Sequence, residues 1–137
     1  MLADTGPLVA IFDRNDALHV PCVRILQSLA KSPLLTTWPC FTEAFYLLTT
    51  VGGYDSREHL WSMRRSGRLA LLDITDTEAD RMDVLMAKYK DVPMDLADAS
   101  LVAVAESRGY RRLFTMDSDF HIYRLADGSV LEVVGHP

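Results

Sequence analysis

The sequence has no long apolar segment and no export signal. Apolar residues make up 49% of its 137 residues, yet no run approaches the roughly 18 residues that a membrane-spanning helix needs. The amino terminus lacks a basic region followed by an apolar run and a cleavage site. We therefore expect a cytoplasmic protein that does not associate with a membrane.

Several residue patterns that define other classes of protein are also missing. The two cysteines, Cys22 and Cys40, fall in apolar helical patterns and are predicted to be small core residues in a reducing cytosol. The four histidines show no ligand spacing with either cysteine, which argues against a zinc site; they are His19, His59, His121 and His136. Glycine-rich nucleotide motifs and the Gly-x-Ser-x-Gly elbow do not occur, which argues against nucleotide-cofactor enzymes and serine hydrolases.

Positive charge is scarce. The chain has 14 Lys and Arg against 19 Asp and Glu, for a net charge of −5. A protein that binds nucleic acid through bulk charge shows a basic excess or a basic stripe. Any contact with nucleic acid therefore needs another device, and divalent cations concentrated at an acidic pocket are one.

The sequence does contain a regular alternation of short strands and helices. Apolar segments predict strands at residues 1–3, 34–37, 69–74, 112–116 and 130–134. Helical spacing of apolar residues predicts helices at residues 7–12, 20–29, 39–51, 55–63 and 75–89, and one more between Pro93 and Gly109. This alternation implies parallel crossover connections. We predict an α/β fold, a three-layer helix–sheet–helix sandwich with a short parallel central sheet, in a single domain covering residues 1–137.

Local signals place the helix ends. Asn15 and Asp16 offer caps for the helix at 20–29, Gly52-Gly53 is expected to end the helix opened by Pro39, and a capping box is predicted to begin the next at Asp55-x-x-Glu58. A second capping box is predicted at Thr75-x-x-Glu78.

The helix after Pro93 is apolar on nearly every side from Leu96 to Ala105, so it is predicted to be buried. Asp95 and Asp98 share a face at its first turn. A capping box with Asp95 as N-cap explains this pair locally. A carboxylate entering a buried helix is otherwise costly unless it is paired, hydrogen-bonded or bound to a metal.

Four acids are expected to meet at one edge of the sheet. Asp4 and Asp117 each end a predicted strand, and in parallel sheets the ligand crevice lies outside the carboxyl ends of the strands. Asp98 and Glu43 begin helices that open onto the same edge. Each also has a local interpretation, as a turn or cap residue for Asp4 and Asp117 and as a solvated helix residue for Glu43. Convergence from four separate segments has no such local interpretation.

Crowded carboxylates repel each other, and a hard divalent cation such as Mg²⁺ relieves the repulsion while retaining water for hydrolysis. We predict Asp4 and Asp98 as principal metal ligands and Asp117 as a further ligand, directly or through water. Glu43 is expected to bind the metal or to orient the attacking water. We expect Thr5 and Ser118, which follow Asp4 and Asp117, to supply hydroxyls around the metal ligands. Capping explains Asp95, Asp119 is expected to cap the turn at residues 120–122, and Asp73 is expected to serve the turn before Thr75.

Four segments, 2–8, 42–44, 96–101 and 114–120, resemble in order the acidic motifs of the PIN domain family, and most closely those of the VapC-type ribonuclease toxins. This resemblance implies an endoribonuclease that depends on Mg²⁺ or Mn²⁺, is usually a homodimer, and is silenced by a small antitoxin protein. It carries over Asp4, Glu43, Asp98 and Asp117 as the acidic catalytic site.

Two other hypotheses remain open from the sequence. One is a PIN-like module that binds RNA or protein without cleaving, and the other is a metal-dependent phosphate hydrolase acting on another substrate. A cluster of arginines beside Trp61 fits an RNA or antitoxin surface as well as a solvated helix face; it comprises Arg57, Arg64, Arg65 and Arg68.

Overall fold

The computed structural model describes residues 1–29 and 31–135, so His136 lies outside the described residues. The strands are β1 (Leu2–Ala3), β2 (Leu34–Thr37), β3 (Leu69–Leu72), β4 (Arg112–Thr115) and β5 (Glu132–Gly135). The helices are α1 (Thr5–Ala10), α2 (His19–Ser28), α3 (Trp38–Arg65), α4 (Asp76–Lys88), α5 (Leu96–Arg108) and the short 3-10 helix η1 (Ser118–His121).

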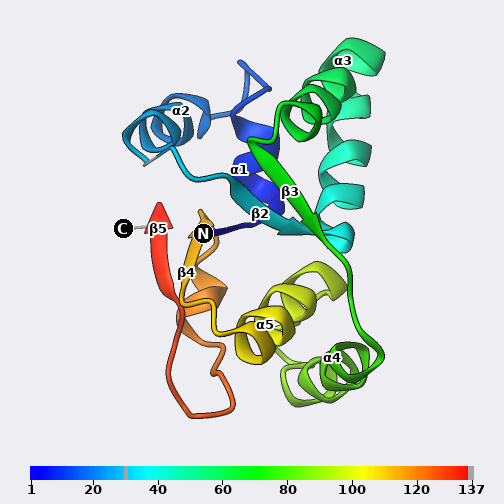
Figure 1. The fold of residues 1–137 in the computed structure, drawn as a ribbon, viewed down its shortest axis with the longest axis vertical. Helices are drawn as coiled ribbons and strands as arrows, with labels where there is room; N and C mark the ends of the chain where they lie inside the picture. The colour runs from blue at the N-terminus through cyan, green and yellow to red at the C-terminus, as the bar shows by residue number, and fades with distance from the viewer. Residues whose placement is uncertain (30, 136–137) are drawn as a thin grey trace.

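The five strands form one parallel sheet in the order β3-β2-β1-β4-β5. Figure 1 shows α1, α2 and α3 on one side of this sheet and α4 and α5 on the other. The predicted three-layer helix–sheet–helix sandwich with a short parallel sheet is therefore confirmed.

Alternate residues of the strands supply two separate cores. Leu2 and Leu113 pack in the core under α4 and α5, whereas Ala3 and Phe114 pack in the core under α1 and α3. Successive side chains of a strand point to opposite faces, so each of these short strands needs apolar residues at neighbouring positions. This explains why each strand contains at least two consecutive apolar residues.

The strand order changes direction between β1 and β4. From β1 the chain adds β2 and β3 on one side, and it later adds β4 and β5 on the other side. Such a switch point leaves a crevice outside the carboxyl ends of the two central strands. Asp4 follows β1 directly, and Asp117 lies two residues beyond the end of β4.

The helix α5 is buried and capped as its sequence predicts. Asp95 is its N-cap and accepts a hydrogen bond of 2.8 Å from the backbone N–H of Asp98. Gly109 ends the helix with a φ of 74°, a left-handed conformation that favours glycine. Residues 97–105 are all buried, while Leu96 is the exception with 55% of its surface exposed.

The helix α3 bends sharply on itself. The rings of Phe41 and Trp61 have centroids 5.2 Å apart, although 20 residues of straight helix would separate them by roughly 30 Å. Figure 1 correspondingly shows two arms of α3 that run in different directions. At Gly52 an added Cβ would lie 1.7 Å from the Ser56 hydroxyl oxygen, so the chain packs closely there. The prediction that the helix ends at Gly52-Gly53 is therefore wrong. α3 continues through these residues and bends instead.

Two predicted helix caps are also wrong. Asp55 and Glu58 lie inside α3. Glu58 does not cap a new helix but pairs with Arg65, about two helical turns further along α3. The N-cap of α2 is Leu18, which makes no side-chain capping bond. The carboxylate of Asp16 instead accepts the backbone N–H of Leu18 at 2.8 Å, in the turn before the helix.

Strand and helix ends elsewhere differ from the predictions by a few residues. β3 ends at Leu72, β4 ends at Thr115, β5 begins at Glu132, and α1 covers Thr5–Ala10. Both cysteines are free and buried, as predicted for core residues. In the part of the chain that the structure describes, no helix is long and apolar enough to cross a membrane.

Candidate active site

A pocket of about 450 Å³ lies at the carboxyl ends of β1 and β4. Five acids from four chain segments line it, namely Asp4, Glu43, Asp95, Asp98 and Asp117. None of its described lining residues is a Lys, Arg or His. The structure therefore brings together the four acids chosen from the sequence and adds Asp95 to them.

Three of these acids also cap helices. Asp4 is the N-cap of α1, Asp95 of α5 and Asp117 of η1. The local interpretation and the clustering are thus both true, because a capping carboxylate lies where its helix begins and these helices begin at the pocket. Asp117 performs the capping that was predicted for Asp119, since it accepts the N–H of Asp119 at 2.9 Å. Asp119 is not among the described residues that line the pocket.

Asp4 is held by hydrogen bonds to both of its carboxylate oxygens. The backbone N–H of Thr5 donates to Oδ1 at 2.7 Å, and the hydroxyl of Thr115 donates to Oδ2 at 2.7 Å. Only 7% of Asp4 is exposed. Burial raises the pKa of Asp4 to about 6, and the nearby charges of Asp117 and Asp95 act in the same direction.

Asp98 lies on the first turn of α5 and is equally buried, with 7% exposed. The hydroxyl of Tyr123 donates to its Oδ2 at 3.0 Å. Burial, followed by the charges of Asp95 and Asp4, raises the pKa of Asp98 well above its usual range, although the Tyr123 hydrogen bond acts in the opposite direction. Neutralising the charge of this pocket would therefore favour ionised Asp98.

Glu43 and Asp117 are more accessible than the other two predicted acids. Glu43 is half-buried on the first arm of α3, and burial followed by the charge of Asp95 raises its pKa. Asp117 is exposed, and its backbone N–H donates to the hydroxyl of Thr115 at 3.0 Å. Asp95, the fifth acid of the pocket, is exposed as well.

The donor set fits a hard divalent cation. Its members are carboxylates without a cationic partner among the described lining residues. Burial and the charges of neighbouring acids disfavour the ionised forms of Asp4, Asp98 and Glu43. Mg²⁺ and Mn²⁺ prefer such oxygen ligands. Within residues 1–29 and 31–135 no three His, Cys, Asp or Glu side chains are close enough together to hold an ion. Binding would therefore require some of these carboxylates to turn toward a common point.

The sequence did not indicate the two side chains that hold the central acids. Thr115 ends β4 two residues before Asp117, and Tyr123 follows η1. A hydroxyl next to a strand-end acid is a weak signal for Thr115, and nothing in the sequence pairs Tyr123 with Asp98. Thr5 and Ser118 do line the pocket, but the Thr5 hydroxyl donates to a backbone carbonyl, that of Cys40.

Asp73, the other acid near a strand end, lies elsewhere. It accepts a hydrogen bond of 2.9 Å from the indole Nε1–H of Trp38. It is not among the described residues that line the acidic pocket. Asp73 was predicted to serve the turn before Thr75, but its carboxylate instead makes a tertiary contact with the start of α3.

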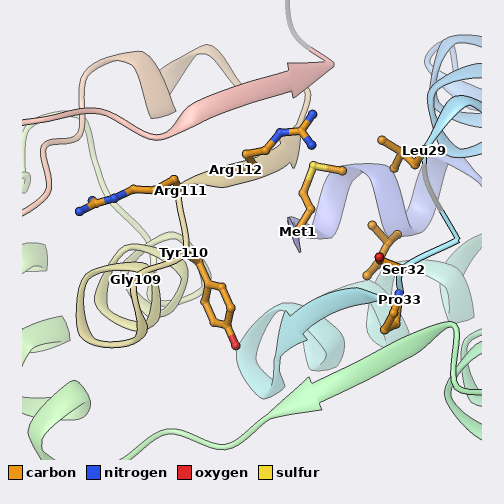
Figure 2. A pocket seen from close by; sticks show the side chains of 9 residues that line it. Met1, Leu29, Ser32, Pro33, Gly109, Tyr110, Arg111 and Arg112 are labelled. Atoms are coloured by element: carbon orange, nitrogen blue, oxygen red, sulfur yellow. The ribbon is translucent and has the colours of Figure 1, made fainter.

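A second hollow, of about 410 Å³, lies at the opposite, amino-terminal edge of the sheet (Figure 2). It is lined partly by Arg111 and Arg112, which are exposed and pair with Asp127 and Glu132 respectively. None of its described lining residues is acidic. This hollow contains none of the predicted site residues and offers no carboxylates to a cation.

The arginine cluster predicted beside Trp61 is only partly a surface patch. Arg65 pairs with Glu58, whereas the guanidinium of Arg57 lies 5.6 Å from the ring centroid of Phe45 and 5.3 Å from that of Tyr54. Arg57 lines an aromatic groove of about 480 Å³ together with Trp38, Phe41, Thr42, Phe45, Tyr46, Thr49 and Trp61. Among the described residues, its Nε is the only buried side-chain nitrogen or oxygen without a hydrogen-bond partner.

The fold and the pocket define a class of protein: a three-layer α/β domain whose acids gather at the switch point of a parallel sheet. The model of the PIN domain matches residues 1–126, and the chain belongs to this family. The family predicted from the four acidic segments is thereby confirmed.

Individual proteins in this family resemble the chain over most of its length. It is 26% identical over 117 residues to ribonuclease VapC26 of Mycobacterium tuberculosis, covering 85% of this chain and 86% of that protein. The structure of M. tuberculosis VapC20, described as a sarcin-ricin loop cleaving toxin, matches with a TM-score of 0.81 at 19% identity, over 88% of this chain and 92% of that one. A toxin–antitoxin complex from Klebsiella pneumoniae matches with a TM-score of 0.61 at 20% identity, over 87% of this chain and 88% of that one. At these identities the two structural matches support the fold.

Proposed function

We propose that this chain is a divalent-metal-dependent endoribonuclease and the toxin of a toxin–antitoxin pair. The observation that carries the proposal is the meeting of Asp4, Glu43, Asp98 and Asp117 at one pocket that lacks a cationic side chain among its described lining residues. Buried carboxylates in such a group destabilise the empty site, so their presence is best explained by a ligand that they bind.

In this proposal each acid has a separate task. Asp4 and Asp98 are the principal ligands, with their orientation set by Thr115 and Tyr123 respectively. Asp117 is a further ligand, directly or through water, and Glu43 binds the metal or orients the attacking water.

When bound, Mg²⁺ or Mn²⁺ supplies water activation and neutralises charge on the carboxylates and the phosphate. Hydrolysis joins the water oxygen to phosphorus, breaks the bond from phosphorus to the leaving ribose oxygen, and leaves a proton on that oxygen. The role of the chain in this proposal is to keep its carboxylates and the RNA phosphate correctly oriented relative to each other during hydrolysis.

RNA is proposed as the substrate because of the family and of the named relatives. VapC26 is named a ribonuclease and VapC20 a toxin that cleaves the sarcin-ricin loop. The net charge of −5 gives RNA no long-range attraction to the whole molecule. A cation at the acidic pocket supplies the local positive charge that the described lining residues do not.

An antitoxin and a second copy of the chain are the proposed protein partners. The complex from Klebsiella pneumoniae supports the antitoxin, since it joins a toxin with an antitoxin. The homodimer is proposed from the family resemblance, and light scattering after size-exclusion chromatography measures it directly.

A cleavage assay with matched variants tests the proposed function. Purified protein, freed of any co-purifying antitoxin, receives RNA, DNA and a generic phosphodiester with Mg²⁺ or Mn²⁺, beside an EDTA control. Asp98→Asn removes one carboxylate charge from the pocket and is expected to lower RNA cleavage by roughly 100-fold or more. Asp83→Asn is the matched control, since Asp83 is exposed on α4 and is not among the lining residues.

Cleavage of RNA alone, lost with EDTA and in Asp98→Asn but kept in Asp83→Asn, would support the proposal. Binding of Mn²⁺ without cleavage of any substrate would favour a non-catalytic RNA- or protein-binding module. Cleavage of DNA or of the generic phosphodiester in preference to RNA would favour a different phosphate hydrolase. Cleavage that survives EDTA would contradict the metal dependence.

A further inference from the structure

Tyr123 connects two parts of the acidic pocket that come from different regions of the chain. It lies in the connection between β4 and β5, six residues after Asp117, and only 2% of its surface is exposed. Its hydroxyl reaches α5, where it donates to Oδ2 of Asp98 at 3.0 Å. The segment that carries Asp117 is thus anchored to the helix that carries Asp98.

The ring of Tyr123 is held in place by its neighbours. It packs edge-on against Tyr89, with centroids 5.1 Å apart, and against Phe120, with centroids 5.2 Å apart. The hydroxyl of Tyr89 accepts the backbone N–H of Arg124 at 2.9 Å, which fixes the chain next to Tyr123. The direction of the Tyr123 hydroxyl is therefore set by packing before any ligand enters.

This hydrogen bond has two consequences for Asp98. It restricts rotation of the carboxylate, because Oδ2 accepts from the hydroxyl of a ring that is itself fixed by packing. A donated hydrogen bond also stabilises the ionised carboxylate, which is the form that binds a cation.

We propose that Tyr123 is a positioning residue that orients the Asp98 carboxylate for a divalent cation. The inference rests on the proposed function, because it assumes that the pocket binds such a cation. Groups that orient metal ligands commonly change metal affinity by 10- to 100-fold when they are removed. A tyrosine with a purely structural role would affect stability and leave the affinity of the folded protein unchanged.

Calorimetric titration of the metal-free full chain with Mn²⁺ tests this inference without using activity. Tyr123→Phe keeps the ring packing and removes the hydroxyl, and its Mn²⁺ affinity is expected to fall by roughly 10-fold. Tyr110→Phe is the matched control, because Tyr110 lines the hollow at the opposite edge of the sheet (Figure 2) and is expected to keep wild-type affinity. Circular dichroism in EDTA establishes that each variant is folded at the titration temperature.

A second comparison separates an effect through Asp98 from a general disturbance. In an Asp98→Ala background, the Tyr123→Phe substitution is expected to change the residual Mn²⁺ affinity by less than about twofold, since the carboxylate that it orients is gone.

Several outcomes overturn the inference. Equal Mn²⁺ affinity of the wild type and Tyr123→Phe would refute it and leave the proposed function intact. An undiminished effect of Tyr123→Phe in the Asp98→Ala background would assign Tyr123 to the fold instead. A wild-type chain that binds neither Mn²⁺ nor Mg²⁺ would refute the metal dependence and this inference together.

Discussion

The hydroxyl of Thr115 serves two of the acids at once. It donates to Oδ2 of Asp4 at 2.7 Å and accepts the backbone N–H of Asp117 at 3.0 Å. Thr115 is fully buried at the end of β4, next to β1 in the sheet. One side chain thus fixes the ends of both central strands relative to each other, at the point where the strand order switches.

Replacing Thr115 with valine is expected to raise the pKa of Asp4 above its value of about 6, because the donated hydrogen bond holds that pKa down. A hydrogen bond contributes about 1 kcal/mol, which corresponds to a pKa increase of up to roughly one. NMR titration of the Asp4 carboxyl carbon in metal-free protein measures this increase. Thr36→Val is the control, since the buried Thr36 hydroxyl donates to a backbone carbonyl, that of Ala3. An unchanged Asp4 titration in Thr115→Val would contradict the assigned role.

The sequence predicted the acids and missed the groups that hold them. Asp4 and Asp117 follow short apolar strands, and the ends of such strands can be recognised from the sequence alone. The hydrogen bond from Tyr123 to Asp98 joins residues 25 apart whose meeting depends on how the β4–β5 connection crosses α5. A local sequence pattern contains no trace of such a contact.

At the scale of elements, α3 bends at a place where its sequence predicts that the helix ends. Two glycines in a row predict a helix stop, yet α3 remains helical through them. The aromatic contacts between its two arms, among them Phe45 with Trp61 at 5.5 Å, stabilise the bend. Tertiary packing between the arms therefore overrides the low helix propensity of glycine.

The packing of α4 against α5 depends on Glu78. The predicted capping box is confirmed, since Glu78 and Thr75 exchange hydrogen bonds at the start of α4. Glu78 also accepts two hydrogen bonds from Arg108, at 2.8 Å and 3.0 Å, and one from the hydroxyl of Ser107. These contacts, with Arg108 the largest, lower the pKa of Glu78 to about 2. The buried carboxylate of Glu78 therefore connects the start of α4 to the end of α5.

We predict that Glu78→Gln lowers the free energy of unfolding by about 2 kcal/mol at neutral pH, a figure reduced for the partial exposure of Arg108. The pKa of Glu78 is lowered in the folded state, so its contribution is complete above its usual value of 4.5 and is lost as the pH falls toward about 2. Urea unfolding of both proteins across this range should show their stabilities converging at acid pH. A constant difference at every pH would mean that shape, not charge, makes the contribution.

At the scale of the whole molecule, alternation of strands and helices was enough to predict three layers and a parallel sheet. The order β3-β2-β1-β4-β5 was not predicted, because it depends on which side of β1 each crossover returns to. Without that order the sequence places strand-end acids at one edge of the sheet but does not say which of them meet. Asp73 follows the outer strand β3 and is not among the described lining residues, whereas Asp4 and Asp117 follow the adjacent strands β1 and β4. Every parallel strand delivers its last residue to the same edge, whatever its neighbours.

The acids at that edge concentrate negative charge, which lowers the stability of the folded protein when no cation is bound. Burial raises the pKa of Asp4 and Asp98 in the folded chain. A carboxyl with a raised folded-state pKa favours folding below its usual value, 3.8, and this contribution is lost as the pH rises through the folded value, about 6 for Asp4. Above that pH the ionised pocket therefore destabilises the metal-free protein.

Asp98→Asn is consequently expected to be more stable than the wild type in EDTA at mildly alkaline pH, by about 1–3 kcal/mol, because a tenfold change in an ionisation constant corresponds to about 1.4 kcal/mol. The advantage should shrink at acid pH, where Asp98 is protonated, and should reverse with saturating Mn²⁺, which stabilises only the form that binds it. Thermal unfolding of both proteins, with Asp83→Asn as the control for an exposed charge, measures each condition. If Asp98→Asn is less stable than the wild type in EDTA at every pH, the Asp98 carboxylate stabilises the metal-free protein. That result would contradict the view that this carboxylate is present to bind a cation.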